Sequence, residues 1–463
     1  MSTPSRNEPC RCGSGKKYKN CCLGKDQAQR AGGRNDLPRS PKVRNLPTAK
    51  PEGGAGPADL LLHYRSLGNS YLAQGKHDAA SRSYRRALAI KPDLAEVHCN
   101  LGLALQSLGD LDAAVKSYRR ALALKPDLAE VHSNLGLVLQ AQGNPDAAVA
   151  SYRRAIAIRP DFADAYYNLG IALKQLGKPD EAVASYRGAI SLNPDHAEAY
   201  GSLANLLRIQ GNPDEALACY RQQLRIRPGN AETQHHIASL TGNSTQSAPA
   251  QYVEKLFDDY ADTFDAHLVQ ALKYEAPAKL VELVVQHMAP AAGKWDVLDL
   301  GCGTGLVGVA IAPYARQLVG VDLSSRMLEK ARARNLYQRL EQLEMLAMAR
   351  GEQASSFDVI IAAEVFVYLG KLDEIVGEIK RLLRPGGVFA FSVEALAASS
   401  NDEAAQGVER DFQLGNTGRY SHSAGYLARL ASASGYSIQE TAATQLRTSR
   451  GNPVDGLLVL WKS

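Results

Sequence analysis

The chain has 463 residues, of which 45% are hydrophobic and 22% are charged. It is therefore too long for one ordinary domain and too apolar to be disordered throughout. Seven cysteines are too few for a disulfide-rich secreted scaffold, and every long apolar run is interrupted by charge or glycine. We therefore expect a cytoplasmic protein with no signal peptide and no membrane span.

The formal net charge of +5 is unevenly distributed along the chain. Residues 1–58 carry 12 Lys and Arg against 4 Asp and Glu, whereas residues 231–463 carry 21 against 27. The basic character is thus concentrated in an N-terminal arm, where it would attract an anionic partner.

Four of the seven cysteines crowd into the start of this arm, as a C-x-C pair and a C-C pair eight residues apart: Cys10, Cys12, Cys21 and Cys22. Two such pairs joined by a Gly-rich turn can surround one tetrahedral ion, and zinc is the usual choice for a thiolate site. Since so short a segment cannot bury a core, a structural Zn²⁺ would also fold it. Four free or oxidised thiols are the alternative.

Residues 5–25, which include N-E-P-C-R-C-G-S-G-K-K-Y-K-N-C-C, resemble the SEC-C motif, with Arg11 where that motif usually has proline. The resemblance implies a ribosome, a chaperone or another acidic partner for this basic zinc knuckle. A merely solubilising charged segment remains the alternative, and nothing indicates sequence-specific DNA binding. Residues 26–58 are rich in proline and glycine, which predicts a flexible linker.

Residues 61–230 contain five copies of a 34-residue unit, in which tyrosine, proline and glycine recur at fixed positions. Each unit reads as two helices with a glycine turn between them. The pattern resembles the tetratricopeptide repeat, an all-α superhelix with a concave, peptide-binding groove. We interpret the recurring tyrosines as core between helices: Tyr84, Tyr118, Tyr152, Tyr186 and Tyr220.

Two further features of the repeats bear on their structure and use. Asp93 with Glu96, Asp127 with Glu130, and Asp195 with Glu198 have the spacing of a capping box, so we expect helices to start at these aspartates. Asn100, Asn134 and Asn168 recur at one position of the first helix, where they are candidates to grip a peptide backbone. Simple tolerance of a polar residue on the helix surface is the alternative.

Residues 231–242 begin like a sixth unit and stop, which predicts a capping helix. His235 and His236 lie in it, but adjacent helical residues point in different directions, so we expect no metal site there.

Residues 251–463 show alternating strands and helices. The stretch from Trp295 to Gly305, W-D-V-L-D-L-G-C-G-T-G, is an apolar strand that ends in an acidic residue and enters a glycine loop before a helix near Leu306. A nucleotide-like cofactor lies at such a strand end in a doubly wound sheet. A dinucleotide fingerprint would have its third glycine at position 306, which is leucine here.

The order D-L-G-C-G-T-G, the strand F-D-V-I-I-A and the segment L-L-R-P-G-G resemble class I S-adenosylmethionine-dependent methyltransferases. Other runs, such as Y-V-E-K-L-F-D-D-Y-A, resemble a bacterial group of predicted methyltransferases that carry tetratricopeptide repeats. We therefore predict a multidomain protein in which an α/β doubly wound, Rossmann-like methyltransferase domain follows the repeats.

The resemblance implies that S-adenosylmethionine is the cofactor and that Asp322, at the end of the second strand, holds its ribose. The other residues that it implies at the cofactor are Asp299, Gly301, Cys302, Gly303, Leu323, Glu344 and Ala363. We interpret Cys302 as a small loop residue and not as a nucleophile. Methyl transfer needs alignment and desolvation more than a base, and the candidate catalytic or positioning residues are Glu364, Tyr368, Tyr420 and His422.

Tyr252, Phe257, Tyr260 and Phe264 lie on a predicted helix, either as core or as an aromatic face for the sulfonium of the cofactor. We expect a methyltransferase whose acceptor is a protein or peptide recruited by the repeat groove. Two alternatives stay open, a scaffold whose cofactor domain no longer turns over and a methyltransferase of small molecules or glycans.

Overall fold

The computed structural model describes residues 56–266, 275–288, 293–396, 410–449 and 452–463. The predicted zinc knuckle and most of the linker lie outside these residues. The chain divides into two compact units between Leu176 and Gly177. We describe each unit by itself.

The first unit consists of helices that pack each on the next. They are α2 (Pro57–Ala73), α3 (His77–Ile90), α4 (Ala95–Ser107), α5 (Leu111–Leu124), α6 (Ala129–Ala141), α7 (Pro145–Ile158) and α8 (Ala163–Gln175). Helix α2 begins at Pro57, inside the segment predicted as linker. Glycines in left-handed conformation make the turns within the repeats, for example Gly109 at φ +80°.

The recurring tyrosines fill the space between neighbouring helices, as predicted. Tyr118 is fully buried, and its ring lies against the backbone of Gly102, where a Cβ atom would come within 2.5 Å of the ring. Tyr84 and Tyr152 have the same relation to Gly68 and Gly136. A small residue on one helix therefore receives the aromatic ring of the next.

The capping-box prediction is wrong. Helix α4 begins at Ala95, and its N-cap residue is Leu94, which makes no side-chain capping hydrogen bond. The same holds for Leu128 before α6. The aspartates bind arginines of neighbouring helices instead, in the pairs Asp93–Arg120, Asp127–Arg154 and Asp195–Arg225. Their carboxylates link helices and do not cap them.

The second unit begins with helices of the same kind and continues into a sheet domain. The helices are α9 (Pro179–Leu192), α10 (Ala197–Ile209), α11 (Pro213–Ile226) and α12 (Ala231–Thr241), which occupies the segment predicted as a cap. Helix α13 (Ala250–Tyr260) and the short α14 (Phe264–Ala266) follow. Among the described residues, no helix combines the length and the apolar character needed to cross a membrane.

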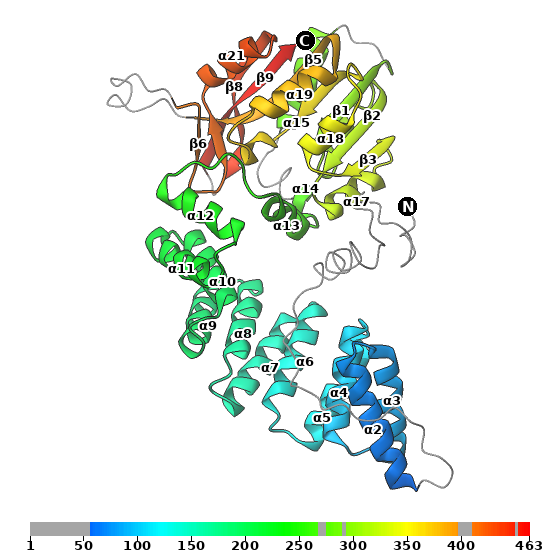
Figure 1. The fold of residues 1–463 in the computed structure, drawn as a ribbon. Helices are drawn as coiled ribbons and strands as arrows, with labels where there is room; N and C mark the ends of the chain where they lie inside the picture. The colour runs from blue at the N-terminus through cyan, green and yellow to red at the C-terminus, as the bar shows by residue number, and fades with distance from the viewer. Residues whose placement is uncertain (1–55, 267–274, 289–292, 397–409, 450–451) are drawn as a thin grey trace, which may run out of the picture. The chain divides into compact units, whose positions relative to one another are not determined.

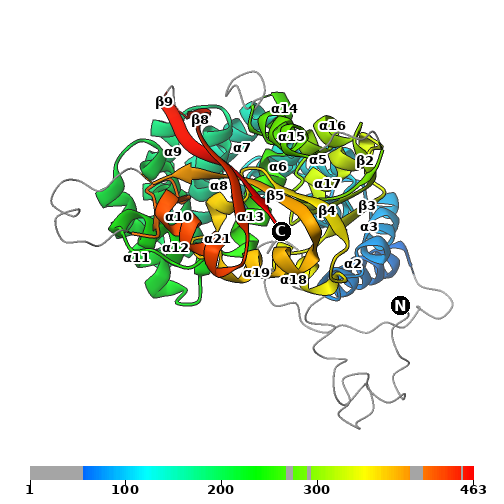
Figure 2. The same ribbon diagram turned by 90° about the horizontal axis from the view of Figure 1, so that it is seen from above.

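A nine-stranded sheet forms the core of the sheet domain, with strands in the order β3-β2-β1-β4-β5-β7-β6 and with β9 pairing both β5 and β8. The parallel strands are β1 (Trp295–Leu300), β2 (Ala315–Asp322), β3 (Arg339–Gln342), β4 (Phe357–Ala362) and β5 (Leu383–Ala395). The edge comprises β6 (Phe412–Leu414), β7 (Tyr420–His422), β8 (Ser437–Ser449) and β9 (Asn452–Lys462), of which β8 and β9 run side by side (Figures 1 and 2).

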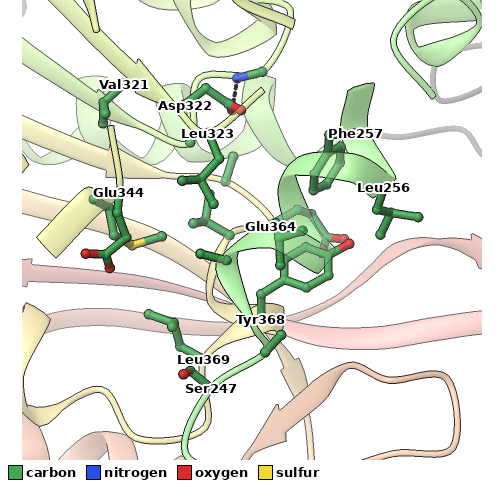
Figure 3. A pocket seen from close by; sticks show the side chains of 18 of the residues that line it. Ser247, Leu256, Phe257, Val321, Asp322, Leu323, Glu344, Glu364, Tyr368 and Leu369 are labelled. Carbon is green, nitrogen blue, oxygen red and sulfur yellow. Dashed lines mark hydrogen bonds between the residues drawn. The ribbon is translucent and has the colours of Figure 1, made fainter. Parts of the chain in front are cut away.

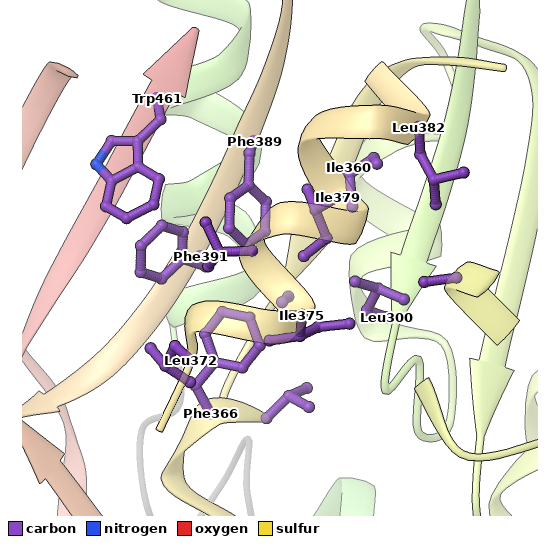
Figure 4. Close-up of a cluster of buried hydrophobic side chains, with 14 of the residues drawn as sticks. Leu300, Ile360, Phe366, Leu372, Ile375, Ile379, Leu382, Phe389, Phe391 and Trp461 are labelled. Carbon is purple, nitrogen blue, oxygen red and sulfur yellow. The ribbon is translucent and has the colours of Figure 1, made fainter. Parts of the chain in front are cut away.

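Helices cover both faces of this sheet. One face packs on α15 (Ala276–His287) and α16 (Leu306–Ile311), and the other on α18 (Met345–Gly351), α19 (Asp373–Leu382) and α21 (Ala424–Ala433). On the second face, Phe389 and Phe391 of β5 lie against Trp461 of β9 and Ile379 of α19 (Figure 4). Two remaining elements, α17 (Ser325–Ala333) and the 3-10 turn η3 (Phe366–Tyr368), follow β2 and β4. The predicted α/β doubly wound fold is confirmed.

Candidate functional site

The glycine loop after β1 approaches the end of β2 through its backbone. Gly301 has φ +65°, and a Cβ atom there would lie 2.4 Å from Cγ2 of Val365. Because any side chain would strain the backbone and meet Val365, the position requires glycine. The next glycine, Gly303, donates its backbone N–H to Oδ2 of Asp322 at 2.9 Å. The loop and the strand end are thus fixed to one another.

Asp322 holds its carboxylate at the carboxyl end of β2. Its second oxygen, Oδ1, accepts the backbone N–H of Ser324 at 2.8 Å. Burial raises the pKa of this carboxyl, while the backbone N–H groups of Ser324, Gly303 and Leu323 oppose that shift. The carboxylate is held rigidly and keeps lone pairs for hydroxyl donors.

A cavity of about 600 Å³ opens beside this loop, within the range of pockets that hold small molecules and cofactors. Leu323, Leu343 and Met345 form one apolar part of its wall, and Phe257, Tyr260 and Phe264 form an aromatic part. The ring of Phe257 meets that of Tyr368 edge to face at 5.6 Å, and Figure 3 shows both side chains facing the same space.

A cluster of four charged side chains lies at another part of the wall, which three of them line: Glu364, Arg419 and Arg447. Arg447 of β8 binds one oxygen of Glu364 and one of Glu394 at 2.5 Å each. Arg419 contacts the same two carboxylates at 3.3 and 3.4 Å, and it donates to the hydroxyl of Tyr368 at 3.2 Å. Burial raises the pKa of Glu364, while Arg447 and Arg419 act in the opposite direction. Two positive and two negative charges thus compensate one another in a largely buried place.

The structure brings most of the predicted site residues together. Residues predicted for the cofactor that line the cavity are Gly301, Gly303, Asp322, Leu323, Glu344 and Ala363, and the catalytic candidates Glu364 and Tyr368 line it as well. Of the predicted aromatic helix residues, Phe257, Tyr260 and Phe264 line the cavity. Tyr252 instead packs against His235 and His236.

Four predicted residues are not among those that line the cavity. Asp299 is fully buried, where Oδ2 accepts the hydroxyl of Tyr337 at 2.6 Å and burial raises the pKa to about 7. Cys302 is buried, and burial raises its thiol pKa, which suits the predicted inert filler. Tyr420 and His422 are fully buried in the β6–β7 hairpin. There Nε2 of His422 lies 3.0 Å from the carbonyl of Gly370.

The sequence did not indicate Arg419 and Arg447, both of which line the cavity. Arg447 lies in no recognisable motif, and Arg419 lies in the run G-R-Y-S-H-S, which resembles the repeat-carrying methyltransferases but assigns this arginine no role. Arg419 ends the loop of the β6–β7 hairpin and Arg447 lies on β8, so only the pairing of strands brings them to the same carboxylates. The only local hint is that Arg419 stands between a glycine and a strand, and this pattern is too common to indicate a site residue.

The remaining predicted sites lie outside the sheet domain. The cysteines of the zinc knuckle fall outside the described residues, and within the part that is described no cluster of His, Cys, Asp and Glu has the arrangement of a metal site. Asn100, Asn134 and Asn168 lie half-buried on α4, α6 and α8, the first helices of their repeats. Asn100 donates to the side-chain oxygen of Asn69 at 3.1 Å.

Comparison with known proteins matches three parts of the chain. A methyltransferase domain model matches residues 298–389. Tetratricopeptide repeat models match residues 68–109, 104–143, 141–177 and 170–231, and a SEC-C motif model matches residues 6–24. A ubiquinone biosynthesis O-methyltransferase of Thiobacillus denitrificans is 30% identical over 164 residues, which are 34% of this chain and 70% of that protein. The chain belongs to the S-adenosylmethionine-dependent methyltransferases.

The chain spans about half the length, or less, of other curated relatives that it matches. A malonyl-[acyl-carrier protein] O-methyltransferase of a Methylovorus species is 34% identical over 154 residues, which are 30% of this chain and 49% of that protein. Among solved structures, the crystal structure of MamA protein is 28% identical to this chain with a TM-score of 0.35, and the match covers 38% of this chain and 95% of that one.

Proposed function

We propose that the protein transfers the methyl group of S-adenosylmethionine to an acceptor held in the cavity between the glycine loop, α13 and the charged cluster. The observation that carries the proposal is the joint placement of the glycine loop and Asp322. The backbone N–H of Gly303 and the carboxylate of Asp322 meet at the carboxyl ends of β1 and β2, where a doubly wound sheet binds such ligands. S-adenosylmethionine, when bound, supplies a methyl group activated by the positive charge on its sulfur.

The residues of the wall suit the parts of this cofactor. Asp322 would accept hydrogen bonds from the ribose hydroxyls, and Leu323 and Met345, which line the cavity, would pack on the adenine ring. Phe257 and Phe264 present aromatic rings that exclude water and attract a sulfonium. Each of these residues would position the cofactor or exclude water from it, so none has to act as a base.

The acceptor, in this proposal, is a protein or peptide that the repeats recruit. Asn100, Asn134 and Asn168 recur at one position on first helices of the repeats and would hydrogen-bond its backbone. The zinc knuckle, with Zn²⁺ on its four cysteines, would bring the enzyme to an acidic assembly. A relative named for ubiquinone biosynthesis makes a small-molecule acceptor the second candidate.

Calorimetric titration of S-adenosylmethionine tests the cofactor. The Asp322→Ala variant should bind it roughly tenfold or more weakly, because hydrogen bonds to a charged group are lost. Asp411→Ala is the matched control, since Asp411 pairs with Arg429 and does not line the cavity. Equal heats for the wild type and the Asp322→Ala variant would contradict the proposed cofactor site.

Labelled methyl donor in a cell extract tests the acceptor. Protein-bound label should fall when Asn100, Asn134 and Asn168 are all replaced by alanine, while cofactor affinity stays unchanged. Label that appears only in small molecules, at the same rate for both enzymes, would favour the second candidate.

A further inference from the structure

Helix α12, which ends the series of repeat helices, also contacts the sheet domain, and both contacts lie within the second unit. Toward the repeats, the ring of His236 stacks on Tyr220 of α11 at 5.1 Å, and the hydroxyl of Thr233 donates to Gln223 at 2.8 Å. Thr233 and His236 are buried. This side of α12 is therefore core between it and the fifth repeat.

The second contact is made to the turn of the β6–β7 hairpin. Ser239 donates its hydroxyl to the carbonyl of Gly415 at 2.7 Å, and Nε2 of His235 lies 3.1 Å from the carbonyl of Gly418. Both side chains are less than 5% exposed. Gly418 donates its backbone N–H to the carbonyl of Gly415, and Gly415 donates its own to the carbonyl of Arg419, which closes the turn.

Arg419 directly follows Gly418 in this closed turn, and its side chain lines the cavity. Its guanidinium contacts Glu364 and Glu394 and donates to the hydroxyl of Tyr368, at distances of 3.2 to 3.4 Å. These contacts are longer than those of Arg447, and the Arg419 side chain is 27% exposed against 8% for Arg447. Its ionic contacts therefore hold Arg419 less firmly than those of Arg447 hold that residue, and the placement of Arg419 depends more on the contacts that fix the turn.

An apolar cluster joins the same parts. Ala238 of α12 packs with Val367, Tyr368, Leu414 and Tyr420, and the cluster also includes Val253 of α13. The backbone N–H of Ala248 donates to the carbonyl of Tyr368 at 2.8 Å, which fixes a second residue of the cavity wall to the segment after α12.

We infer that α12 is a working part of the methyltransferase site: Ser239 and His235 are positioning residues that hold the hairpin turn so that Arg419 reaches the cavity. The inference rests on the proposed function in that it takes this cavity as the place of methyl transfer. Neither residue touches the cavity, so both act through Arg419. The last repeat helix and one wall of the cavity are thus connected through the hairpin turn, so that a change in one is expected to move the other.

A double-mutant cycle on the full chain tests the positioning role. Unfolding midpoints in urea are measured for Ser239→Ala, Arg419→Gln and the double variant, with Arg419→Lys as a milder second change. The expected result is a double variant little less stable than the worse single variant, because Ser239 acts through Arg419. Thr241→Val is the matched control, since this hydroxyl of α12 donates to the carbonyl of Ile237 in its own helix and accepts from Asn243 just after it. Additive shifts for Ser239→Ala and Arg419→Gln would overturn the inference.

A second readout separates positioning from general damage. Ser239→Ala should lower the rate of methyl incorporation at saturating cofactor roughly threefold to tenfold, the effect of one neutral hydrogen bond. Its affinity for S-adenosylhomocysteine, measured by calorimetry, should stay within about twofold of the wild type. An equal fall in both quantities would overturn the inference. A wild type that binds no S-adenosylhomocysteine would refute the proposed function, while the unfolding cycle would still decide whether Ser239 acts through Arg419.

Discussion

Replacing Gly301 by alanine would perturb the loop that forms the cofactor side of the cavity. The left-handed backbone at φ +65° would cost an alanine about 1 to 2 kcal/mol. Its Cβ atom would also lie 2.4 Å from Cγ2 of Val365, and overpacking of this kind costs about 1 to 3 kcal/mol. We therefore expect Gly301→Ala to lower the free energy of unfolding of the sheet domain by about 2 to 5 kcal/mol.

Tryptophan fluorescence during urea unfolding measures this change selectively. The two tryptophans of the chain, Trp295 and Trp461, lie on β1 and β9, so the signal reports the sheet domain and not the repeat helices. Gly435→Ala is the matched control in the same domain. Gly435 has φ +69°, but its Cβ atom would meet nothing within 4 Å, so only the backbone cost of about 1 to 2 kcal/mol is expected.

A second substitution isolates the steric part. Val365→Ala in the Gly301→Ala background removes the methyl groups that the new Cβ atom would meet, so the double variant should lose less than the sum of the two single losses. If Gly301→Ala and Gly435→Ala destabilise the domain equally, or if the two changes at 301 and 365 add, the contact with Val365 has no energetic weight and the reasoning is wrong.

Three further outcomes are expected. Burial lowers the pKa of His422 to about 4, so the unfolded chain binds the extra proton between pH 6.5 and 4. Stability should therefore rise with pH through that window, by about 3 kcal/mol in total, and urea titrations of His422→Gln should show a flatter dependence. A fragment of residues 251–463 should melt less cooperatively in calorimetry than a fragment of residues 177–463. The shorter fragment lacks Ala238 and Ser239, which pack on the hairpin. Equal melting of the two fragments would show that α12 does not stabilise the sheet domain. Metal analysis of the full chain should find one zinc, which is lost when Cys21 and Cys22 become serine; an unchanged zinc content would exclude these ligands.

The sequence alone predicted the parts of the site that one short segment contains. The loop with Gly301 and the strand end at Asp322 lie within one βαβ unit, so local spacing is enough to place them together. Arg419 and Arg447 could not be found in this way. They meet Glu364 and Glu394 only because β7 and β9 both pair with β5 and β8 pairs with β9, and no local pattern encodes that pairing.

The repeats show the same division between local and non-local information. The period of 34 residues placed Tyr118 in the core correctly, and the rings of Tyr84, Tyr118 and Tyr152 each lie against a glycine of a neighbouring helix. The spacing of Asp93 and Glu96 suggested a cap, but Asp93 instead meets Arg120, 27 residues further on. A carboxylate near a helix start has two competing uses, and the cation that decides between them belongs to another helix.

The backbone of Glu364 links the charged cluster to the proposed function. Its backbone has φ +57°, a left-handed conformation that is unfavourable for a residue with a side chain, and its N–H donates to the hydroxyl of Ser392 at 2.8 Å. Glycine at this position would relieve the strain but would leave Arg447, which is 8% exposed, with one carboxylate partner instead of two. The fold thus keeps a strained glutamate where, together with Glu394, it neutralises two arginines at the cavity wall. Unpaired cations at the cavity wall would repel the sulfonium of S-adenosylmethionine. The proposed cofactor therefore requires that the charges of Arg419 and Arg447 be neutralised.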